Sequence, residues 1–249
     1  MLRRFLLAVQ FLTRLPVPRG LATTEAELGQ AAAFFPLVGV IVGALTAAVF
    51  LLIQRVMPFS VAVFLTLAFA AFITSGFHED GLADAFDGLG GGWTKDRALE
   101  IMRDSRIGTY GSLALIFLVL GKYTALTMLE PHQIWRWLIL AHTASRWTVL
   151  PLCLWLPYAR AEGQGKFVAR QIGFPAFLTG SLTLVLILLL FPRRVALVSV
   201  AVVAAVTMFS GIYFRRRLNG ITGDCLGAAN QITELALYLT AALVRWNIP

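Results

Sequence analysis

Three aspartates stand in one short stretch of the sequence at a spacing that could hold a metal ion. Asp80, Asp84 and Asp87 lie within residues 78–88, directly after an apolar segment. If this stretch is helical, the three carboxylates share one face, because an α-helix completes a turn in about 3.6 residues. Like charges on one face repel one another, and a divalent cation removes that repulsion. Ligation by carboxylates alone suits Mg²⁺ or Mn²⁺ rather than zinc, so we predict a magnesium site here.

Residues beside the aspartates allow plainer interpretations. An acidic turn exposed to solvent at a membrane surface would explain one aspartate, but three on one face favour metal binding. His78 is either a histidine at the membrane interface or a catalytic group that accepts a proton. The glycine-rich run at residues 88–92 lacks the lysine of a phosphate-binding loop, so we expect a flexible turn after the acidic helix.

A charged segment follows, and it contains candidate phosphate ligands. Arg103 and Arg106 stand close in sequence to the acidic stretch, and arginine is suited to bidentate contacts with phosphate. Asp104 lies between them, and we expect it to contact the substrate or to complete the metal site. The alternative is an ordinary charged helix at the surface. Gly108 and Gly111 would allow the backbone to approach closely before the next apolar segment.

Near the C-terminus, a polar segment leads into the last apolar stretch. Asp224 is either the N-terminal cap of a helix that begins here or a further ligand of the metal site. Asn219 and Thr222 precede it in a glycine-rich turn, and we expect both to contact the substrate.

Several ionisable groups lie inside apolar segments, where polar groups are costly and usually face the interior of a helical bundle. Arg146 and His142 are four residues apart and share a helix face, so they are candidates to pair with Glu234 or to bind an anionic ligand. We therefore count Arg146 and Glu234 among the substrate-binding candidates. Lys122 is explained as a side chain that snorkels toward the membrane surface.

The composition indicates an integral membrane protein. Of 249 residues, 58% are hydrophobic and 14% are charged. Soluble domains carry about 25% charged residues, so this chain has too little polar surface to cover a soluble globule. A helix needs about 20 largely apolar residues to cross a bilayer. About seven segments meet this requirement: 34–56, 59–77, 110–129, 134–156, 174–191, 195–214 and 225–244.

The predicted fold is therefore all-α, a polytopic helical membrane protein. Residues 1–249 form one membrane domain, with an acidic region at about residues 78–109. Residues 1–12 combine a basic start with an apolar stretch, like a signal peptide, but no small-residue cleavage site follows. We expect them to form an amphipathic helix at the membrane interface.

The distribution of lysine and arginine predicts the orientation. With about seven spans, most basic residues outside the spans fall on the side of the N-terminus, and few fall on the opposite side. The first group is Arg3, Arg4, Arg14, Arg19, Lys95, Arg97, Arg103, Arg106, Arg160, Lys166, Arg170, Arg215, Arg216 and Arg217; the second is Arg55, Arg193, Arg194 and Arg245. Because cytoplasmic loops are rich in these residues, the N-terminus and the acidic region are predicted to be cytoplasmic and the C-terminus to lie outside. This explains the net charge of +8 without nucleic acid, for which the chain offers no basic, aromatic-rich soluble face.

Five blocks of sequence, in order along the chain, carry a resemblance to a known family. They are FLTRLPVP at 11–18, FPLVG at 35–39, HEDGLADAFDG at 78–88, LEIMRDSRIGT at 99–109 and TGDCLGA at 222–228. The chain resembles the adenosylcobinamide-GDP ribazoletransferases, also called cobalamin 5′-phosphate synthases. The resemblance implies a Mg²⁺-dependent phosphotransferase of late cobalamin biosynthesis in the prokaryotic cytoplasmic membrane. Such an enzyme joins α-ribazole, or α-ribazole 5′-phosphate, to a corrinoid-GDP and releases GMP.

Combined with this resemblance, the motifs give a site hypothesis. Asp80, Asp84, Asp87 and Asp224 would hold Mg²⁺, and His78 or a carboxylate would accept the proton of the attacking hydroxyl group. The acidic block also looks like a variant of the aspartate motif of CDP-alcohol phosphotransferases, but the arginine typical after its Asp-Gly element is absent. The alternatives are such a phosphotransferase, or an ion-coupled transporter that uses the groups inside the apolar segments. The sequence leaves open whether chains associate as a homo-oligomer.

Overall fold

The computed structural model describes residues 1–18, 21, 25–160 and 172–246, and this part of the chain is built from helices. In chain order these are α1 (Leu2–Leu12), α2 (Glu25–Ala31), the 3₁₀ turn η1 (Ala32–Phe34), α3 (Phe35–Ile53), α4 (Phe59–Ile73), α5 (Phe77–Gly91), α6 (Lys95–Ile101), α7 (Thr109–Thr127), α8 (Pro131–Trp147), α9 (Val149–Trp155), α11 (Phe174–Leu188), α12 (Arg193–Leu218) and α13 (Gly223–Trp246). Apart from an isolated bridge between Tyr158 and Ile221, the described residues form no β-structure, which confirms the all-α prediction. Arg19, Lys166 and Arg170 of the charge distribution lie outside the described residues, as does the side chain of Arg245.

Every apolar segment predicted as a span forms helix, with segment 134–156 divided between α8 and α9. By length and composition, three helical stretches of the described chain could cross a membrane: Glu27–Ile53, Thr109–Thr127 and Arg193–Leu218. The pair α4 and α5 passes the same test as a unit, but it bends by 86° at the break between the two helices. The structure supports a membrane-embedded helical protein, and the number of about seven spans stays a prediction.

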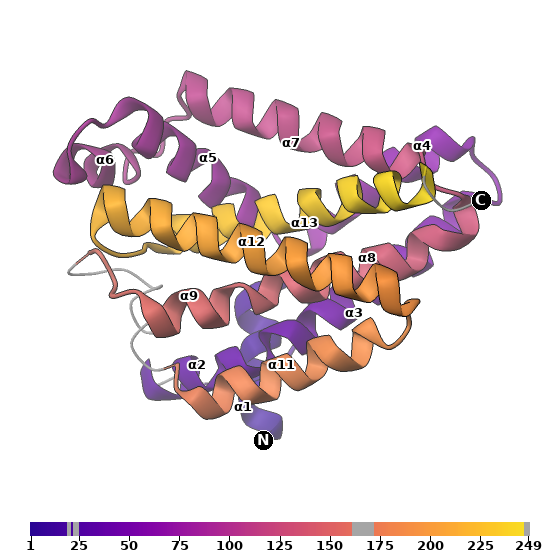
Figure 1. Ribbon diagram of the computed structural model, residues 1–249, viewed down its shortest axis with the longest axis horizontal. Helices are drawn as coiled ribbons and strands as arrows, with labels where there is room; N and C mark the ends of the chain where they lie inside the picture. The colour runs from indigo at the N-terminus through magenta and orange to yellow at the C-terminus, as the bar shows by residue number, and fades with distance from the viewer. Residues whose placement is uncertain (19–20, 22–24, 161–171, 247–249) are drawn as a thin grey trace.

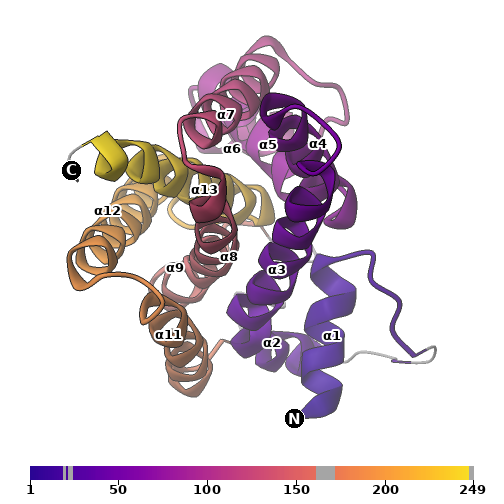
Figure 2. The same cartoon turned by 90° about the vertical axis from the view of Figure 1, so that its right-hand side faces the viewer.

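The long helices run along one axis of the molecule, and their connections gather at its two ends (Figure 1). At one end, on the left of Figure 1, lie α5, α6, the end of α9 and the turn between α12 and α13. At the other end lie the turns that join α3 to α4, α7 to α8 and α11 to α12. Figure 2 shows α8 and α13 near the centre, with the other long helices around them. This arrangement places the acidic region and the turn before α13 at the same end.

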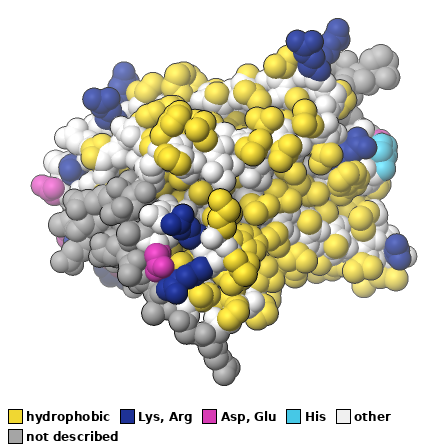
Figure 3. Space-filling model, turned by 90° about the horizontal axis from the view of Figure 1, so that it is seen from below, with side chains coloured by type: hydrophobic (Ala, Val, Ile, Leu, Met, Phe, Trp, Pro, Cys, Tyr) yellow, Lys and Arg dark blue, Asp and Glu magenta, His cyan; other side chains and the backbone are white. Residues whose placement is uncertain are grey.

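Large apolar side chains cover much of the outside of this bundle. Phe117, Leu182 and Phe209 are each at least 60% exposed. On the face shown in Figure 3, hydrophobic side chains gather across the middle, and most lysine and arginine side chains lie toward the two ends of the long axis. Such a surface would be costly in water, whereas in a bilayer it contacts lipid.

The N-terminal helix α1 forms as predicted, but its apolar face contacts protein. Leu7, Val9 and Leu12 are buried, and the ring of Phe11 stacks on that of Phe35 at the start of α3, with ring centroids 5.8 Å apart. The interfacial helix of the prediction is therefore part of the wall of the bundle.

The acidic helix α5 is separated from α4 by a sharp turn. Ser75 and Gly76 both adopt positive φ angles, 60° and 65°, a conformation that is strained for serine and free for glycine. Arg14 holds the turn: its backbone N–H donates to the Ile73 carbonyl over 2.8 Å, and its Nε donates to the Ser75 hydroxyl over 2.6 Å. Because α4 ends here, α5 starts in a new direction and crosses to α13.

Two glycines let α5 and α13 touch. A Cβ atom at Gly81 would lie 3.2 Å from the Cα of Asp224, and one at Gly227 would lie 3.1 Å from the Cα of Gly81. Larger residues at either position would hold the helices apart. The contact brings the aspartates of α5 next to the first turn of α13.

The glycine-rich run at residues 88–92 was predicted to be a flexible turn, and this is wrong. Helix α5 continues through Gly91. The run packs closely against α6, because a Cβ atom at Gly88 would lie 2.7 Å from the Ala98 carbonyl oxygen and one at Gly92 would lie 2.5 Å from the Ala98 Cα. The glycines serve helix packing rather than flexibility.

Candidate active site

A cavity of about 220 Å³ lies where α5 and α13 meet at the acidic end of the bundle. Its walls come from helices far apart in sequence, including α1, α3 and α8. The polar lining is His78, Asp80, Arg146, Tyr158, Arg160 and Asp224, and the apolar lining is Phe11, Leu12, Phe35, Phe77, Val149 and Leu226. Of the site residues predicted from sequence, the cavity therefore brings together His78, Asp80, Arg146 and Asp224.

Arg160 is a site residue that the sequence did not reveal. Its Nη2 donates to Oδ2 of Asp224 over 2.7 Å, across 64 residues of sequence. The backbone before it is fixed, since the Ala159 N–H donates to the Ile221 carbonyl over 2.8 Å and the Ile221 N–H to the Pro157 carbonyl over 2.9 Å. In the sequence Arg160 counted only as one more cytoplasmic charge, and no local pattern marks a partner so distant.

Thr222 caps α13, so Asp224 does not have to. The Thr222 hydroxyl accepts from the backbone N–H of Cys225 over 3.2 Å, which is the contact of an N-cap residue. It also lies 3.3 Å from Oδ2 of Asp224. The carboxylate of Asp224 is thus held in the cavity by Thr222 and Arg160, and the cap interpretation of this aspartate is wrong.

Asn219 has a structural position instead of a place in the cavity. It is exposed and ends α12 in the left-handed conformation, with a φ of 53°, and its N–H donates to the Arg215 carbonyl over 3.0 Å. Asparagine is one of the few residues that adopt this conformation readily. Contact between Asn219 and substrate stays a prediction.

The aspartates of α5 share one face, as predicted, but they have different surroundings. Asp80 lines the cavity, and together with Asp84 it also lines a second, more open hollow of about 540 Å³. Burial, followed by the negative charges of Asp80 and Asp224, raises the pKa of Asp84 to about 7. The first two aspartates of α5 and Asp224 therefore form one crowded group of carboxylates outside the predicted spans.

Asp87 is the exception, because its carboxylate binds backbone. Oδ2 accepts from the Gly108 N–H over 2.7 Å and Oδ1 from the Gly111 N–H over 2.9 Å. Both amides belong to the start of α7, so Asp87 caps that helix. The glycines allow this approach, since a Cβ atom at Gly111 would lie 2.8 Å from the Ala83 carbonyl oxygen. Sequence had predicted a close backbone approach at these glycines, but not its partner.

The donors at the site fit a hard divalent cation in type. Asp80, Asp84 and Asp224 offer carboxylate oxygens, which Mg²⁺ prefers, and Arg160 is the cation seen beside them. Within the described residues, no three carboxylate, imidazole or thiol groups converge closely enough to hold an ion as they stand. Burial, followed by the charges of Asp80 and Asp224, raises the pKa of Asp84, so a bound cation would stabilise the charged form of this carboxylate.

The three predicted site residues of the charged segment do not line the cavity. Arg106 pairs with Asp104 over 2.6 Å on the surface, and this contact lowers the pKa of Asp104 to about 2. Both line an open hollow of about 520 Å³ beside Asp87. Arg103 is exposed. Their contact with substrate stays a prediction.

A second polar cluster lies deeper in the bundle, around Glu234. Lys122 donates from Nζ to Oε1 of Glu234 over 2.9 Å and to Oε1 of Gln231 over 2.5 Å. Nδ1 of His142 lies 3.2 Å from Oε2 of Glu234. The expected pairing of Glu234 is therefore made by His142, and not by Arg146. Lys122 does not snorkel, because its side chain is only 6% exposed and ends on this carboxylate.

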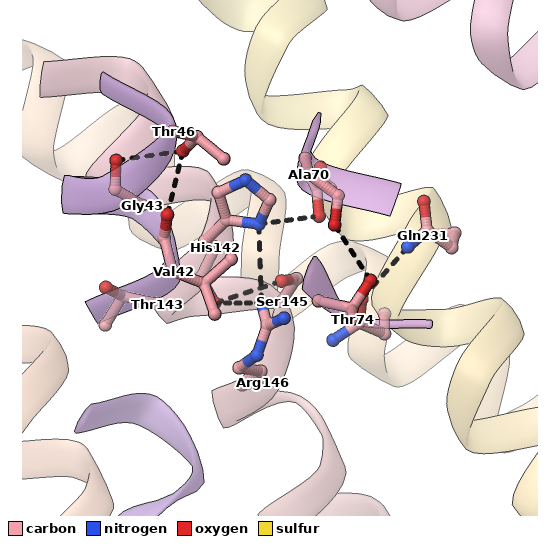
Figure 4. A network of polar contacts seen from close by, with 12 residues as sticks. Val42, Gly43, Thr46, Ala70, Thr74, His142, Thr143, Ser145, Arg146 and Gln231 are labelled. Carbon is pink, nitrogen blue, oxygen red and sulfur yellow. Dashed lines mark hydrogen bonds and ion pairs between the residues drawn. The ribbon is translucent and has the colours of Figure 1, made fainter. Parts of the chain in front are cut away.

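Arg146 lies between this buried cluster and the cavity. It follows His142 by one turn of α8, and Figure 4 shows the two side chains next to each other, with Gln231 on the neighbouring helix. Its Nη1 donates to the His142 carbonyl over 3.0 Å. Arg146 thus joins the cavity described above to the interior of the bundle.

Comparison with known proteins gives a consistent result. The family model described as cobalamin-5-phosphate synthase matches residues 4–242. Three relatives carry the name adenosylcobinamide-GDP ribazoletransferase. The one from Vibrio cholerae is 43% identical over 244 residues, 96% of this chain and 92% of the relative. Those from Ralstonia pickettii and a Shewanella species are 43% identical over 234 residues (92% and 91% of the two chains) and 38% identical over 245 residues (96% and 94%).

No solved structure matches the chain. The family match spans nearly its whole length, and both the acidic helix and the turn before α13 fall within it. On these findings, the chain belongs to the cobalamin-5-phosphate synthase family.

Proposed function

We propose that this protein joins α-ribazole, or α-ribazole 5′-phosphate, to adenosylcobinamide-GDP and releases GMP. The observation that carries the proposal is the family match over residues 4–242, supported by relatives whose names state this transfer. The alternatives, a phosphotransferase that uses CDP-alcohols and an ion-coupled transporter, have no comparable support.

In the proposed reaction, the 3′-hydroxyl oxygen of ribazole attacks the phosphorus that bears the cobinamide. A new O–P bond forms, the bond to the bridging oxygen breaks, and GMP leaves with that oxygen. The hydroxyl proton passes to a group of the cavity. His78 is buried there and is within the same lining as Asp80 and Asp224, so these three are the candidate acceptors.

Mg²⁺, as the resemblance implies, would be held by Asp80, Asp84 and Asp224, and when bound it would neutralise the diphosphate and stabilise the leaving GMP. The chain itself contributes position. Arg160 and Thr222 orient Asp224, and the contact at Gly81 sets the distance between the two helices. Phosphoryl transfer depends mainly on such positioning and on charge stabilisation. Asp87 remains a predicted ligand, although its oxygens are engaged by α7.

The test is a turnover assay on purified protein with adenosylcobinamide-GDP, α-ribazole 5′-phosphate and Mg²⁺, in which GMP release is followed. EDTA should stop the release. Asp84→Asn should lower it by about a hundredfold to a thousandfold, the range found when one group that stabilises the charge of a transition state is removed, with membrane insertion intact. Undiminished release in that variant would remove Asp84 from the mechanism, and no release by the wild-type protein would contradict the proposed function.

We further propose that the protein lies in the prokaryotic cytoplasmic membrane, with the N-terminus and the cavity on the cytoplasmic side. The support is that α6 and the last turn of α12 lie at the end of the bundle that holds the cavity (Figure 1), and these segments carry Lys95, Arg97 and Arg215–Arg217. Trp93, which is 94% exposed, lies at this end, and His132, also exposed, lies at the other.

Cysteine labelling tests this orientation. The native Cys153 and Cys225 are buried and should give little background. A membrane-impermeant maleimide should label His132→Cys in intact cells and Trp93→Cys only after the membrane is opened. The reverse pattern would invert the assigned orientation.

A further inference from the structure

The cavity combines two opposite kinds of charge. Asp80 and Asp224 line it from α5 and α13, whereas Arg146 lines it from α8. Carboxylates hold a metal ion or repel an anion, and a guanidinium group binds an anion directly. The cavity therefore offers two chemically distinct subsites.

Arg146 is a buried cation without a carboxylate partner. It is 1% exposed, and among the described residues no carboxylate lies within 4.0 Å of its guanidinium group. Nη1 is bonded only to the His142 carbonyl and, at 3.4 Å, to the His142 ring, and Nε has no partner. An unpaired buried charge is costly, so this group is built to receive an anion from outside the chain.

Within the described chain, Arg146 has no ion-pair partner because the nearby carboxylate of Glu234, deeper in the bundle, is bonded to other side chains. Glu234 is the carboxylate nearest along the network, but Lys122 occupies its Oε1 and His142 its Oε2. Glu234 and, more weakly, Glu79 attract Arg146 electrostatically, but neither carboxylate reaches ion-pair distance. Lys122 and His142 therefore act as positioning residues, because they hold both oxygens of Glu234 and leave none for a direct ion pair with Arg146.

The apolar lining and the volume of the cavity indicate which anion Arg146 binds. The rings of Phe11, Phe35 and Phe77 supply an aromatic wall that suits a flat, apolar base. A volume of about 220 Å³ is of the size of a nucleoside and far below that of a corrinoid, which must stay outside. The diphosphate of the other substrate is attached to that corrinoid, so it belongs with the carboxylates and their metal ion.

We propose that Arg146 binds the 5′-phosphate of the ribazole nucleotide and makes the enzyme prefer the phosphorylated over the free nucleoside. This rests on the proposed function for the identity of the nucleoside. A phosphate monoester carries a charge of about −1.5 to −2 near neutral pH, and arginine can bind it through two parallel N–H groups. Binding of the nucleotide thus brings to Arg146 the negative charge that no carboxylate of the described chain provides at ion-pair distance.

The experiment measures binding, so it does not depend on turnover. Thermal unfolding of the detergent-solubilised protein is followed with increasing α-ribazole 5′-phosphate or α-ribazole, and the ratio of the two dissociation constants is taken for each variant. Arg146→Gln should lower the preference for the phosphorylated nucleoside at least tenfold, as expected for a lost charge-assisted contact. Arg146→Lys, which keeps the charge without the bidentate geometry, should give an intermediate ratio.

Arg136→Gln is the matched control, because Arg136 lies on the same helix but is exposed; its ratio should equal that of the wild type. A wild-type ratio in a folded Arg146→Gln protein, judged by circular dichroism and elution volume, overturns the proposal. If that variant does not fold, a wild-type ratio in Arg146→Lys overturns it. An unchanged ratio with weaker binding of adenosylcobinamide-GDP also overturns it, since Arg146 would then serve the diphosphate.

The two proposals can fail separately. Asp84→Asn should lower GMP release by about a hundredfold or more but keep the binding preference. Absence of GMP release from the wild type would contradict the transfer reaction, while the ratio of dissociation constants would still decide the role of Arg146.

Discussion

The bundle contains two groups of charges, and they are organised in opposite ways. Near the junction of α5 and α13, Asp80, Asp84 and Asp224 repel one another electrostatically with Arg160 as the cation seen beside them, and burial and this repulsion raise the pKa of Asp84. Around Glu234, both carboxylate oxygens are bonded to buried side chains of α7 and α8. The first group leaves charge unbalanced at a cavity, whereas the second balances it in the core. From this difference we infer that the ion pairs around Glu234 stabilise the fold, whereas the unpaired charges at the cavity mark the place where substrate binds and reacts.

The core group should be the more important for stability. Lys122→Met would leave Glu234 with only His142 and should cost about 3–5 kcal/mol, the usual result of removing one partner of a buried pair. Unfolding in mixed micelles with increasing SDS would measure it. The double variant Lys122→Met with Glu234→Gln, which removes both charges of this pair, should regain most of the loss. Equal destabilisation of single and double variants would show that the pair contributes little.

The catalytic activity of the cavity group should depend on how closely α5 and α13 approach each other. Gly81→Ala would place a methyl group 3.2 Å from the Asp224 Cα, so α5 must shift relative to α13, and GMP release should fall about tenfold because catalytic geometry tolerates little displacement. Gly91→Ala is the matched control, since Gly91 lies on the same helix away from the cavity and a Cβ atom there would meet only Cδ1 of Ile101, at an ordinary contact distance of 3.5 Å. Similar activity in the two variants would mean that the close contact does not set the catalytic geometry.

Asp87 belongs to neither group of charges, because its carboxylate is bonded to backbone amides. Asp87→Ala should lower stability by about 1–2 kcal/mol through loss of the cap on α7. Comparing the Mg²⁺ concentration that half-restores GMP release in this variant and in the wild type tells its roles apart. An unchanged requirement, together with the stability loss, would assign Asp87 to the fold; a requirement raised tenfold or more would restore it as a metal ligand.

The sequence predicted what depends on local spacing. Helix α5 and the shared face of Asp80 and Asp84 follow from a period of about 3.6 residues, and the apolar segments identified the long helices. Contacts across the chain could not be found in this way. Arg160 meets Asp224 over 64 residues, and Lys122 meets Glu234 over 112, so neither partner is marked by its neighbours in sequence.

The errors have the same origin. A run of glycines is flexible in isolation, but α6 packs against it and keeps it helical. The side chain of a lysine in an apolar segment usually extends to the membrane surface. Lys122 instead bonds the carboxylate of Glu234 on α13, which lies beside it. In both cases a tertiary partner overrides a local preference.

The wall formed by α1 has a consequence for how the protein comes into being. Phe11 and Leu12 of α1 contribute to the same chamber as Leu226 and Gly227 of α13, so the chamber is closed by helices that lie more than 200 residues apart in the sequence. A nascent chain can insert α1 long before α13 has been synthesised, but it cannot enclose a nucleotide until both helices are in place. Catalytic competence therefore depends on the arrival of α13.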